Sequence, residues 1–194
     1  MTDFPQIIKK RFPFIPDERL VELLSFGELI MLKEGEIFIK EGEWSQKVGF
    51  VIEGMMRNYI LNDKGEQITV VFATEMQAIA PYAAVFLKRP ASETTEAIEP
   101  TILYVFDFEN FKKNMDVDPL YTRIYAEFLE TILVAAIERI EDLTKKKPVD
   151  RYKRLLDNHG YLIERAPLKY LASYLGITAV SLSRIRKRLS KSRN

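Results

Sequence analysis

The stretch 168-LKYLASYLGITAVSLSRIRK-187 has the spacing of a helix-turn-helix. Ala172 falls where the second helix crosses the first and only a small side chain fits, and Gly176 falls in the turn, where glycine adopts a positive φ at little cost. Five apolar side chains are expected to join the two helices: Leu171, Leu175, Ile177, Leu182 and Ile185. Such a unit can place its second helix in the major groove of DNA, so the stretch predicts a DNA-binding element.

The second helix of this unit is expected to begin near Thr178, because a threonine hydroxyl can accept a bond from a free amide at a helix start. We predict that Arg184 contacts a base, since a guanidinium grips O6 and N7 of guanine with two hydrogen bonds. The expected phosphate contacts are Arg186, Lys187, Arg188 and Lys191. Ser181 and Ser183 lie on or beside the same outward arc, and Tyr170 and Ser173 of the first helix are candidates for contact with the DNA backbone. The alternative for residues 186–188 is a solvated helix end.

The charge distribution agrees with this prediction. The formal net charge is only +1, but residues 145–194 hold 14 Lys and Arg against three Asp and Glu. The first 144 residues hold 15 basic and 25 acidic side chains. A basic end on an acidic body suggests a nucleic-acid-binding module. The alternative is a solvated basic tail.

Short apolar runs separated by glycine turns fill residues 29–106. The turns are marked by glycines at 35, 42, 54 and 65. Many short strands at nearly regular spacing predict a β-sandwich or barrel. The expected strands are 29–33, 37–40, 48–53, 55–61, 67–73, 94–98 and 102–106. Short helices are expected at 17–24 and 107–115.

A long helix is predicted from Pro119 to Lys145, and two apolar rows run along it. One row can cover the β-domain while the other meets a partner helix, which predicts a symmetric homodimer. The residues assigned to the dimer contact are Leu129, Leu133, Ala136 and Ile140. The alternative is a helix buried within a monomer. Pro148 ends this helix and starts a new segment, with a further helix over 149–158.

Several classes of function are excluded or disfavoured by composition. The chain has no cysteine, which excludes disulfides, iron–sulfur clusters and thiolate zinc sites. Its single histidine, His159, precedes Gly160 and is interpreted as a helix-end residue. No phosphate-binding glycine loop or metal-ligand spacing is present, so we expect no enzyme, no catalytic residue and no metal site. The lack of a long apolar run or a secretion signal predicts a cytoplasmic protein.

The combination resembles the Crp/Fnr family of bacterial transcription regulators. The segments 33-KEGEIFIKEGE-43 and 48-VGFVIEGMMRNYILNDKGEQITVVF-72 are similar to the family's cyclic-nucleotide-binding β-roll, and 170-YLASYLGIT-178 with 181-SLSRIRKRL-189 is similar to its DNA-binding end. The resemblance implies an α+β fold: an antiparallel β-roll of the jelly-roll type (1–116), a long dimerisation helix with a hinge (117–147) and a winged-helix-like helix-turn-helix domain (148–194). It also implies a dimer on a near-palindromic operator, with RNA polymerase as a partner and no membrane.

The chain departs from the family where cyclic AMP is usually held. The matching region, 72–100, lacks the Gly-Glu pair that serves the ribose, and Ala91 stands at the position of the phosphate-binding arginine. We therefore expect that cyclic AMP does not bind in the usual mode and that any effector is another small molecule. The candidate pocket residues are Tyr82, Phe86, Arg89 and Ser92. A haem sensor would need an axial histidine or cysteine near the roll, which the sequence does not offer.

The second helix of the helix-turn-helix also departs from the family, because Ala179 and Val180 stand where many members carry polar side chains. These two apolar side chains could pack on thymine methyl groups. We expect an operator that differs from the common family consensus. Two alternatives remain open: a stand-alone cyclic-nucleotide sensor, or a ligand-independent scaffold that acts through a protein partner.

Overall fold

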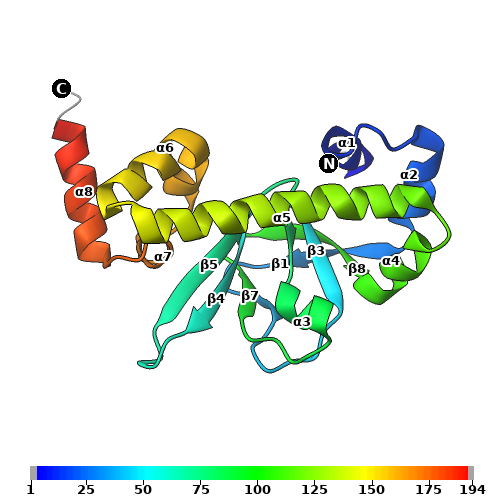
Figure 1. Ribbon diagram of the computed structural model, residues 1–194, viewed down its shortest axis with the longest axis horizontal. Coiled ribbons are helices and arrows are strands. Elements are labelled where there is room, and N and C mark those ends of the chain that lie inside the picture. Colours follow the sequence, from blue (N-terminus) through cyan, green and yellow to red (C-terminus); the bar gives the residue numbers. More distant parts are fainter. Residues whose placement is uncertain (1–3, 192–194) are drawn as a thin grey trace. The chain divides into compact units, whose positions relative to one another are not determined.

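A computed structural model describes residues 4–191 of the chain (Figure 1). Two helices come first, α1 (Phe4–Arg11) and α2 (Asp17–Leu24). The strands are β1 (Gly27–Leu32), β2 (Ile37–Ile39), β3 (Lys47–Glu53), β4 (Met56–Leu61), β5 (Gln67–Ala73), β6 (Ala78–Ile79), β7 (Thr94–Ala97) and β8 (Thr101–Asp107), with α3 (Tyr82–Leu87) between β6 and β7. The remaining helices are α4 (Phe108–Met115), α5 (Pro119–Lys145), α6 (Pro148–Arg165), α7 (Leu168–Tyr174) and α8 (Ala179–Lys191).

The chain packs as two compact units. The first consists of the described residues up to Ile60 together with Val70–Phe128, and the second of Leu61–Thr69 together with the described residues from Leu129 onward. Helix α5 therefore contributes its first turns to one unit and its longer remainder to the other.

The strands form two antiparallel four-stranded sheets, in the orders β1-β8-β3-β6 and β2-β7-β4-β5. Strand β8 is central to the first sheet: it pairs with β1 from Gly27↔Phe106 to Leu32↔Thr101 and with β3 from Lys47↔Asp107 onward. The inner faces of both sheets meet in a core of apolar side chains, as in a β-sandwich. The core includes Leu32, Val51, Met56, Ile79, Leu103 and Val105. The predicted jelly-roll type of fold is thereby confirmed.

The turn between β3 and β4 shows why a glycine is required in this roll. Gly54 has φ +103, and a Cβ placed there would lie 2.5 Å from the Thr101 hydroxyl oxygen and 2.6 Å from the carbonyl oxygen of Pro100. Any other residue would be strained in this conformation and would also clash with the backbone of the neighbouring turn.

A second apolar core covers the outer face of the β1-β8-β3-β6 sheet. Ile8 and Phe12 of α1 and Leu20 of α2 pack there with Phe50 and Tyr104 of the sheet, and Ile124 of α5 joins them. Full burial of one such side chain contributes about 1.5–3 kcal/mol, so the flanking helices belong to the folded unit.

In the second unit, α6 is interrupted at His159, whose φ of −141° and ψ of 44° are not helical. The prediction of a helix ending at His159-Gly160 was therefore right about the break. It was wrong about the residues after the break, because the chain resumes a helix there and continues to Arg165.

Elsewhere the predicted elements agree with the structure within one or two residues, and α5 has the predicted bounds. The sequence prediction contained neither the two-residue strand β6 nor helix α3, both too short to show a period. Over residues 148–191 the structure has helices and turns and no strand, so the expected wing is not seen among the described residues.

Candidate nucleic-acid interface and ligand sites

Helices α7 and α8 pack together as the sequence predicted. Leu171, Ala172, Leu175 and Leu182 are buried between them, and the amide of Ile177 donates to the carbonyl oxygen of Ala172 at 3.0 Å. Gly176 has φ +65 in the turn, the left-handed conformation that its position requires. The buried pairs fix the angle of α8 against α7, so the outer face of α8 has a defined orientation within this unit.

The hydroxyl of Thr178 caps α8. Thr178 Oγ1 accepts a hydrogen bond from the amide of Ser181 at 3.1 Å and donates one to Ser181 Oγ at 3.0 Å. The predicted start of the helix is confirmed, and this capping bond satisfies one of the free amides of its first turn.

Replacing Thr178 by alanine should destabilise the C-terminal unit by about 1 kcal/mol, because the capping acceptor is lost. Thermal unfolding followed by circular dichroism measures this, and Thr178→Ser should restore most of the stability because it keeps the hydroxyl. Equal losses in both variants would show that the methyl group matters rather than the cap.

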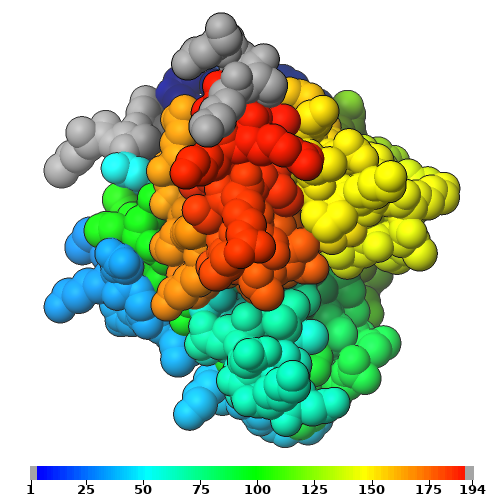
Figure 2. Space-filling view, turned by 90° about the vertical axis from the view of Figure 1, so that its left-hand side faces the viewer, coloured from blue at the N-terminus to red at the C-terminus, as the bar shows by residue number. Residues whose placement is uncertain are grey.

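The outer face of α8 is basic. Ser183, Arg184, Lys187 and Arg188 are exposed, and Val180 is also exposed. Figure 2 shows α8, in red, at the surface. The structure thus brings the expected base-reading residue and two of the expected phosphate contacts onto one face. Ser181 is half-buried beside its capping partner, and the side chain of Lys191 lies outside the described residues.

Three other candidates are placed differently. Arg186 lies against α6: its guanidinium is 3.4 Å from the carbonyl oxygen of Ile163, its Nε is buried without a partner, and it faces the Tyr152 ring. This placement disagrees with a phosphate contact. A helix turns about 100° per residue, so Arg186 cannot share the outward direction of Arg184. On α7, Ser173 is half-buried and bonded to the Tyr170 carbonyl and to Thr69, and the half-buried ring of Tyr170 lies under the ammonium of Lys169.

The sequence did not single out Arg151, which has a structural role. It is buried, and it donates from Nε to the carbonyl oxygen of Leu175 and from Nη1 to that of Lys146, both at 2.9 Å. These bonds tie α6 to the end of α7. The only available signal was an arginine beside apolar residues in 151-RYKRLL-156. Charge counting alone cannot separate this buried arginine from those on the outer face of α8.

Helix α5 carries exposed apolar side chains in its middle. Leu133 is 60% exposed, Val134 56%, Ile137 50% and Ile140 65%. Ala136 is exposed too, whereas Leu129 is half-buried. The first turns of the same helix bury Tyr121 and Ile124 in the first unit. The helix therefore covers the β-domain with one part and leaves an apolar stretch open to water with another.

The interior of the roll holds an arginine that the sequence prediction missed. Arg57 on β4 is fully buried and forms an ion pair with Glu96 of β7, with Nη2 2.6 Å and Nε 2.7 Å from the same carboxylate oxygen. Next to it, Asn58 accepts from the Thr95 hydroxyl and donates to the Ala80 carbonyl. A charged residue inside the apolar run 55–61 was the available signal. The glutamate neutralises this arginine, so the pair presents no free cation to an anionic ligand.

The four pocket candidates do not share one environment. Tyr82 and Phe86 stack on each other, with ring centroids 5.9 Å apart, and belong to an aromatic cluster. Arg89 and Ser92 are exposed. The structure therefore brings Tyr82 and Phe86 together but does not place Arg89 and Ser92 with them. Tyr82 and Phe86 belong to α3, whereas Arg89 and Ser92 follow its end, where Lys88 has φ +50.

Glu93 stands two residues after the position where the family's arginine is missing. Burial raises its pKa to about 7, and a hydrogen bond with Asn58 partly opposes this shift. The protonated carboxyl adds no attraction for a phosphate, and the ionised carboxylate repels one.

Glu93 should also make stability depend on pH. The folded protein keeps the proton above pH 4.5, where the unfolded chain releases it, so stability falls as pH rises from about 4.5 to about 7. Glu93→Gln should remove this loss, which we expect to be on the order of 3 kcal/mol. Urea unfolding of both proteins at pH 4.5, 6 and 8 measures the difference. A difference that does not change with pH would contradict the raised pKa.

Part of the chain matches a known family of domains. Residues 29–118 match the family model described as the cyclic nucleotide-binding domain. No curated protein matches the chain. Within the described residues, no helix is long and apolar enough to cross a membrane.

Several solved structures share the fold. FixK2 from Bradyrhizobium japonicum is 18% identical with a TM-score of 0.75 and covers 86% of this chain and 85% of its own. The c-di-GMP-responsive regulator CLP from Xanthomonas campestris is 14% identical with a TM-score of 0.73, covering 91% and 93%. The catabolite activator protein from Thermus thermophilus is 18% identical with a TM-score of 0.58, covering 94% and 87%. Residues 29–118 are therefore similar to the cyclic nucleotide-binding domain, and the chain shares the fold of these solved structures.

Proposed function

We propose that this protein is a DNA-binding transcriptional regulator of the Crp/Fnr type that acts as a homodimer on a near-palindromic operator. The observation that carries the proposal is the outer face of α8. Arg184, Lys187 and Arg188 are exposed there on a helix that Thr178 caps and that the α7–α8 core holds at a fixed angle. An exposed basic helix on a helix-turn-helix suits the major groove, with the arginine reading guanine and the neighbouring cations meeting phosphates.

The exposed stretch of α5 supports the dimer. Leu133, Ile137 and Ile140 are spaced at intervals of four and three, so they lie on one side of the helix. Side chains of this size that are half exposed or more over two turns form a contiguous apolar stripe, which monomers seldom leave in water. A second copy of the same helix would cover the stripe in a two-fold pair.

We propose domain limits at 1–116 for the β-roll, 117–147 for the dimer helix and hinge, and 148–194 for the helix-turn-helix domain. Helix α5 is the proposed dimer helix. A dimer presents two copies of α8, which suits an operator with two related half-sites. Bound to such an operator, the protein would act by recruiting or obstructing RNA polymerase. Its partner would be DNA and its site of action the cytoplasm. No enzymatic role is proposed.

Cyclic AMP in the usual mode does not suit this roll. Ala91 takes the position of the phosphate-binding arginine, Arg57 is paired with Glu96, and Glu93 lies beside them. An anionic phosphate would meet no free guanidinium among these residues. Any effector of this protein is therefore expected to be a molecule other than cyclic AMP bound in the usual mode.

Selection from a library of random double-stranded DNA tests the proposed function. The expected product is one enriched sequence with two inverted half-sites whose centres lie about 10 base pairs or a multiple of that apart. Calorimetry with cyclic AMP, run alongside, should show no saturable heat at millimolar concentration. Absence of any enriched sequence would contradict the DNA-binding proposal and favour a sensor or a scaffold that acts through a protein.

A further inference from the structure

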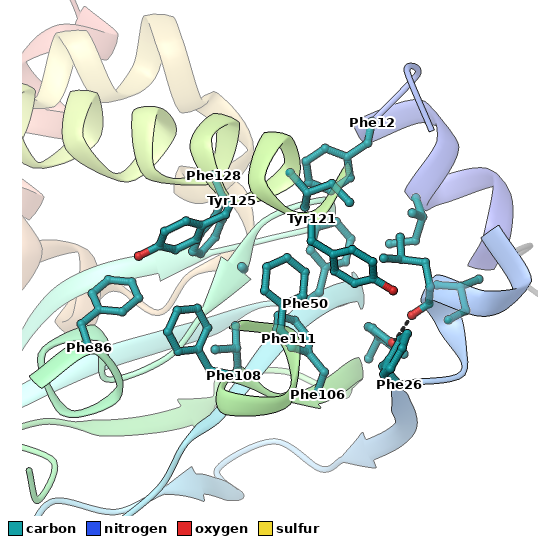
Figure 3. A pocket seen from close by; sticks show the side chains of 17 residues that line it. Phe12, Phe26, Phe50, Phe86, Phe106, Phe108, Phe111, Tyr121, Tyr125 and Phe128 are labelled. Atoms are coloured by element: carbon teal, nitrogen blue, oxygen red, sulfur yellow. Dashed lines mark hydrogen bonds between the residues drawn. The ribbon is translucent and has the colours of Figure 1, made fainter. Parts of the chain in front are cut away.

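The first unit contains a cavity that the proposed function does not use (Figure 3). It lies among α1, α2 and α4, the outer face of the β3-β8 sheet and the first turns of α5. The empty space is about 790 Å³, a figure that includes a part open to solvent.

The lining is almost entirely hydrocarbon. Seventeen side chains line the cavity, none of them is charged, and most are aromatic. Several neighbouring rings meet edge-on: the centroids of Phe111 and Tyr121 are 5.3 Å apart at 64°, and those of Phe86 and Phe108 are 5.4 Å apart at 61°. Ring faces and edges arranged in this way suit a flat apolar molecule.

One polar atom in the lining lacks a partner. Tyr121 is only 2% exposed, and its hydroxyl is buried with no hydrogen bond. By contrast, the hydroxyl of Tyr104, also in the lining, donates to the carbonyl oxygen of Leu23 at 3.1 Å. Figure 3 shows the Tyr121 hydroxyl on the side of Phe26. Burial also raises the pKa of Tyr121, so the hydroxyl keeps its proton and is a donor. A buried donor without an acceptor costs free energy that a bound acceptor would recover.

The same lining excludes several kinds of ligand. A cyclic phosphate or a fatty acid would bring a negative charge into a cavity whose lining has no cation. A haem would bring two negatively charged propionates into the same cation-free lining, which also lacks the histidine or cysteine that most often ligates haem iron. The remaining class is an uncharged molecule with little polar surface.

We propose that this cavity is a binding site for an uncharged, flat, mostly apolar small molecule that carries one hydrogen-bond acceptor, which pairs with the Tyr121 hydroxyl. The site lies on the outer face of the β3-β8 sheet and is separate from the Arg57–Glu96 pair inside the roll. Tyr121, Ile124, Tyr125 and Phe128 of α5 are part of its lining, so an occupant would contact the helix whose later turns carry the apolar stripe. Control of DNA binding by this contact rests on the proposed function. Binding of the small molecule to the cavity does not depend on that function.

A pair of probes tests the proposal on the full chain without DNA. Naphthalene has no acceptor, and 2-acetonaphthone is a similar flat molecule with one carbonyl. Competition against a neutral fluorescent dye, N-phenyl-1-naphthylamine, gives both affinities. The unmodified protein should bind both probes at one saturable site, with 2-acetonaphthone about five- to tenfold tighter, as expected for one added hydrogen bond.

Two variants locate the hydrogen bond. Tyr121→Phe should remove the advantage of 2-acetonaphthone and leave the affinity for naphthalene unchanged within about twofold. Tyr104→Phe is the matched control, since it also deletes a hydroxyl from the lining but one that is already bonded; the advantage should persist. An advantage that survives in Tyr121→Phe overturns the assigned role of that hydroxyl.

A third variant fills the space. Ala78 lines the cavity, and Ala78→Phe should lower the affinity for both probes at least tenfold. Circular dichroism reports whether this variant folds. If Ala78→Phe does not fold, the affinities of Tyr121→Phe for the two probes test the proposal instead. No saturable binding to the unmodified protein, or undiminished binding to a folded Ala78→Phe, overturns the site. These outcomes are independent of DNA, so they are distinguishable from failure of the proposed function.

Discussion

Replacing Leu133 by glutamate is expected to turn the protein from a dimer into a monomer at micromolar concentration. Leu133 is 60% exposed in the single chain, so the change disturbs little within one copy. In a two-fold pair it buries two carboxylates in an apolar contact, where an unpaired charge is strongly disfavoured. We expect the dissociation constant of the dimer to rise by at least about 100-fold, which corresponds to about 2.7 kcal/mol.

Sedimentation velocity over a range of concentrations measures this change. The matched control is Leu87→Glu, because Leu87 is 64% exposed on α3 and lies outside the stripe of α5. That variant should remain a dimer. A Leu133→Glu protein that stays dimeric would place the interface elsewhere, and a monomeric unmodified protein would remove the dimer from the proposed function.

Replacing Arg184 by alanine is expected to abolish most of the sequence preference of DNA binding. Arg184 is exposed on the outer face of α8, three residues after the capped first turn, where base edges come within reach of a recognition helix. Loss of a bidentate contact to guanine costs about 1–3 kcal/mol, so affinity for the selected operator should fall about 5- to 150-fold. Affinity for unrelated DNA should fall much less.

Fluorescence anisotropy with the selected operator and a scrambled duplex, each over a series of salt concentrations, separates the two effects. Arg188→Ala is the comparison variant, since a phosphate contact lowers affinity for both duplexes and reduces the salt slope by about 1. Arg186→Lys adds a negative control, because Arg186 faces α6 rather than the outer surface. An Arg184→Ala protein that loses equal affinity for both duplexes would show that this arginine meets phosphate instead of a base.

The strands and most helices were predictable because their signals are local. Gly54 and Gly176 mark turns whose positive φ the sequence alone requires, and the apolar period over residues 119–145 is long enough to give both ends of α5. Helix α3 was not predictable in the same way. Its six residues are shorter than two helical turns, and their packing against Phe108 and Tyr125 decides their conformation.

The sequence by itself determined the class of the protein: a β-roll, a long helix and a capped helix-turn-helix with a basic outer face. These features result from spacing, turn residues and charge, which act over a few neighbouring positions. Only the tertiary structure decided which charges are available. It buried Arg57 against Glu96 and Arg151 against backbone carbonyls, turned Arg186 toward α6, and left the Tyr121 hydroxyl without a partner in an aromatic cavity. The physical reason is that burial and pairing depend on residues far apart in the chain, and no local pattern records them.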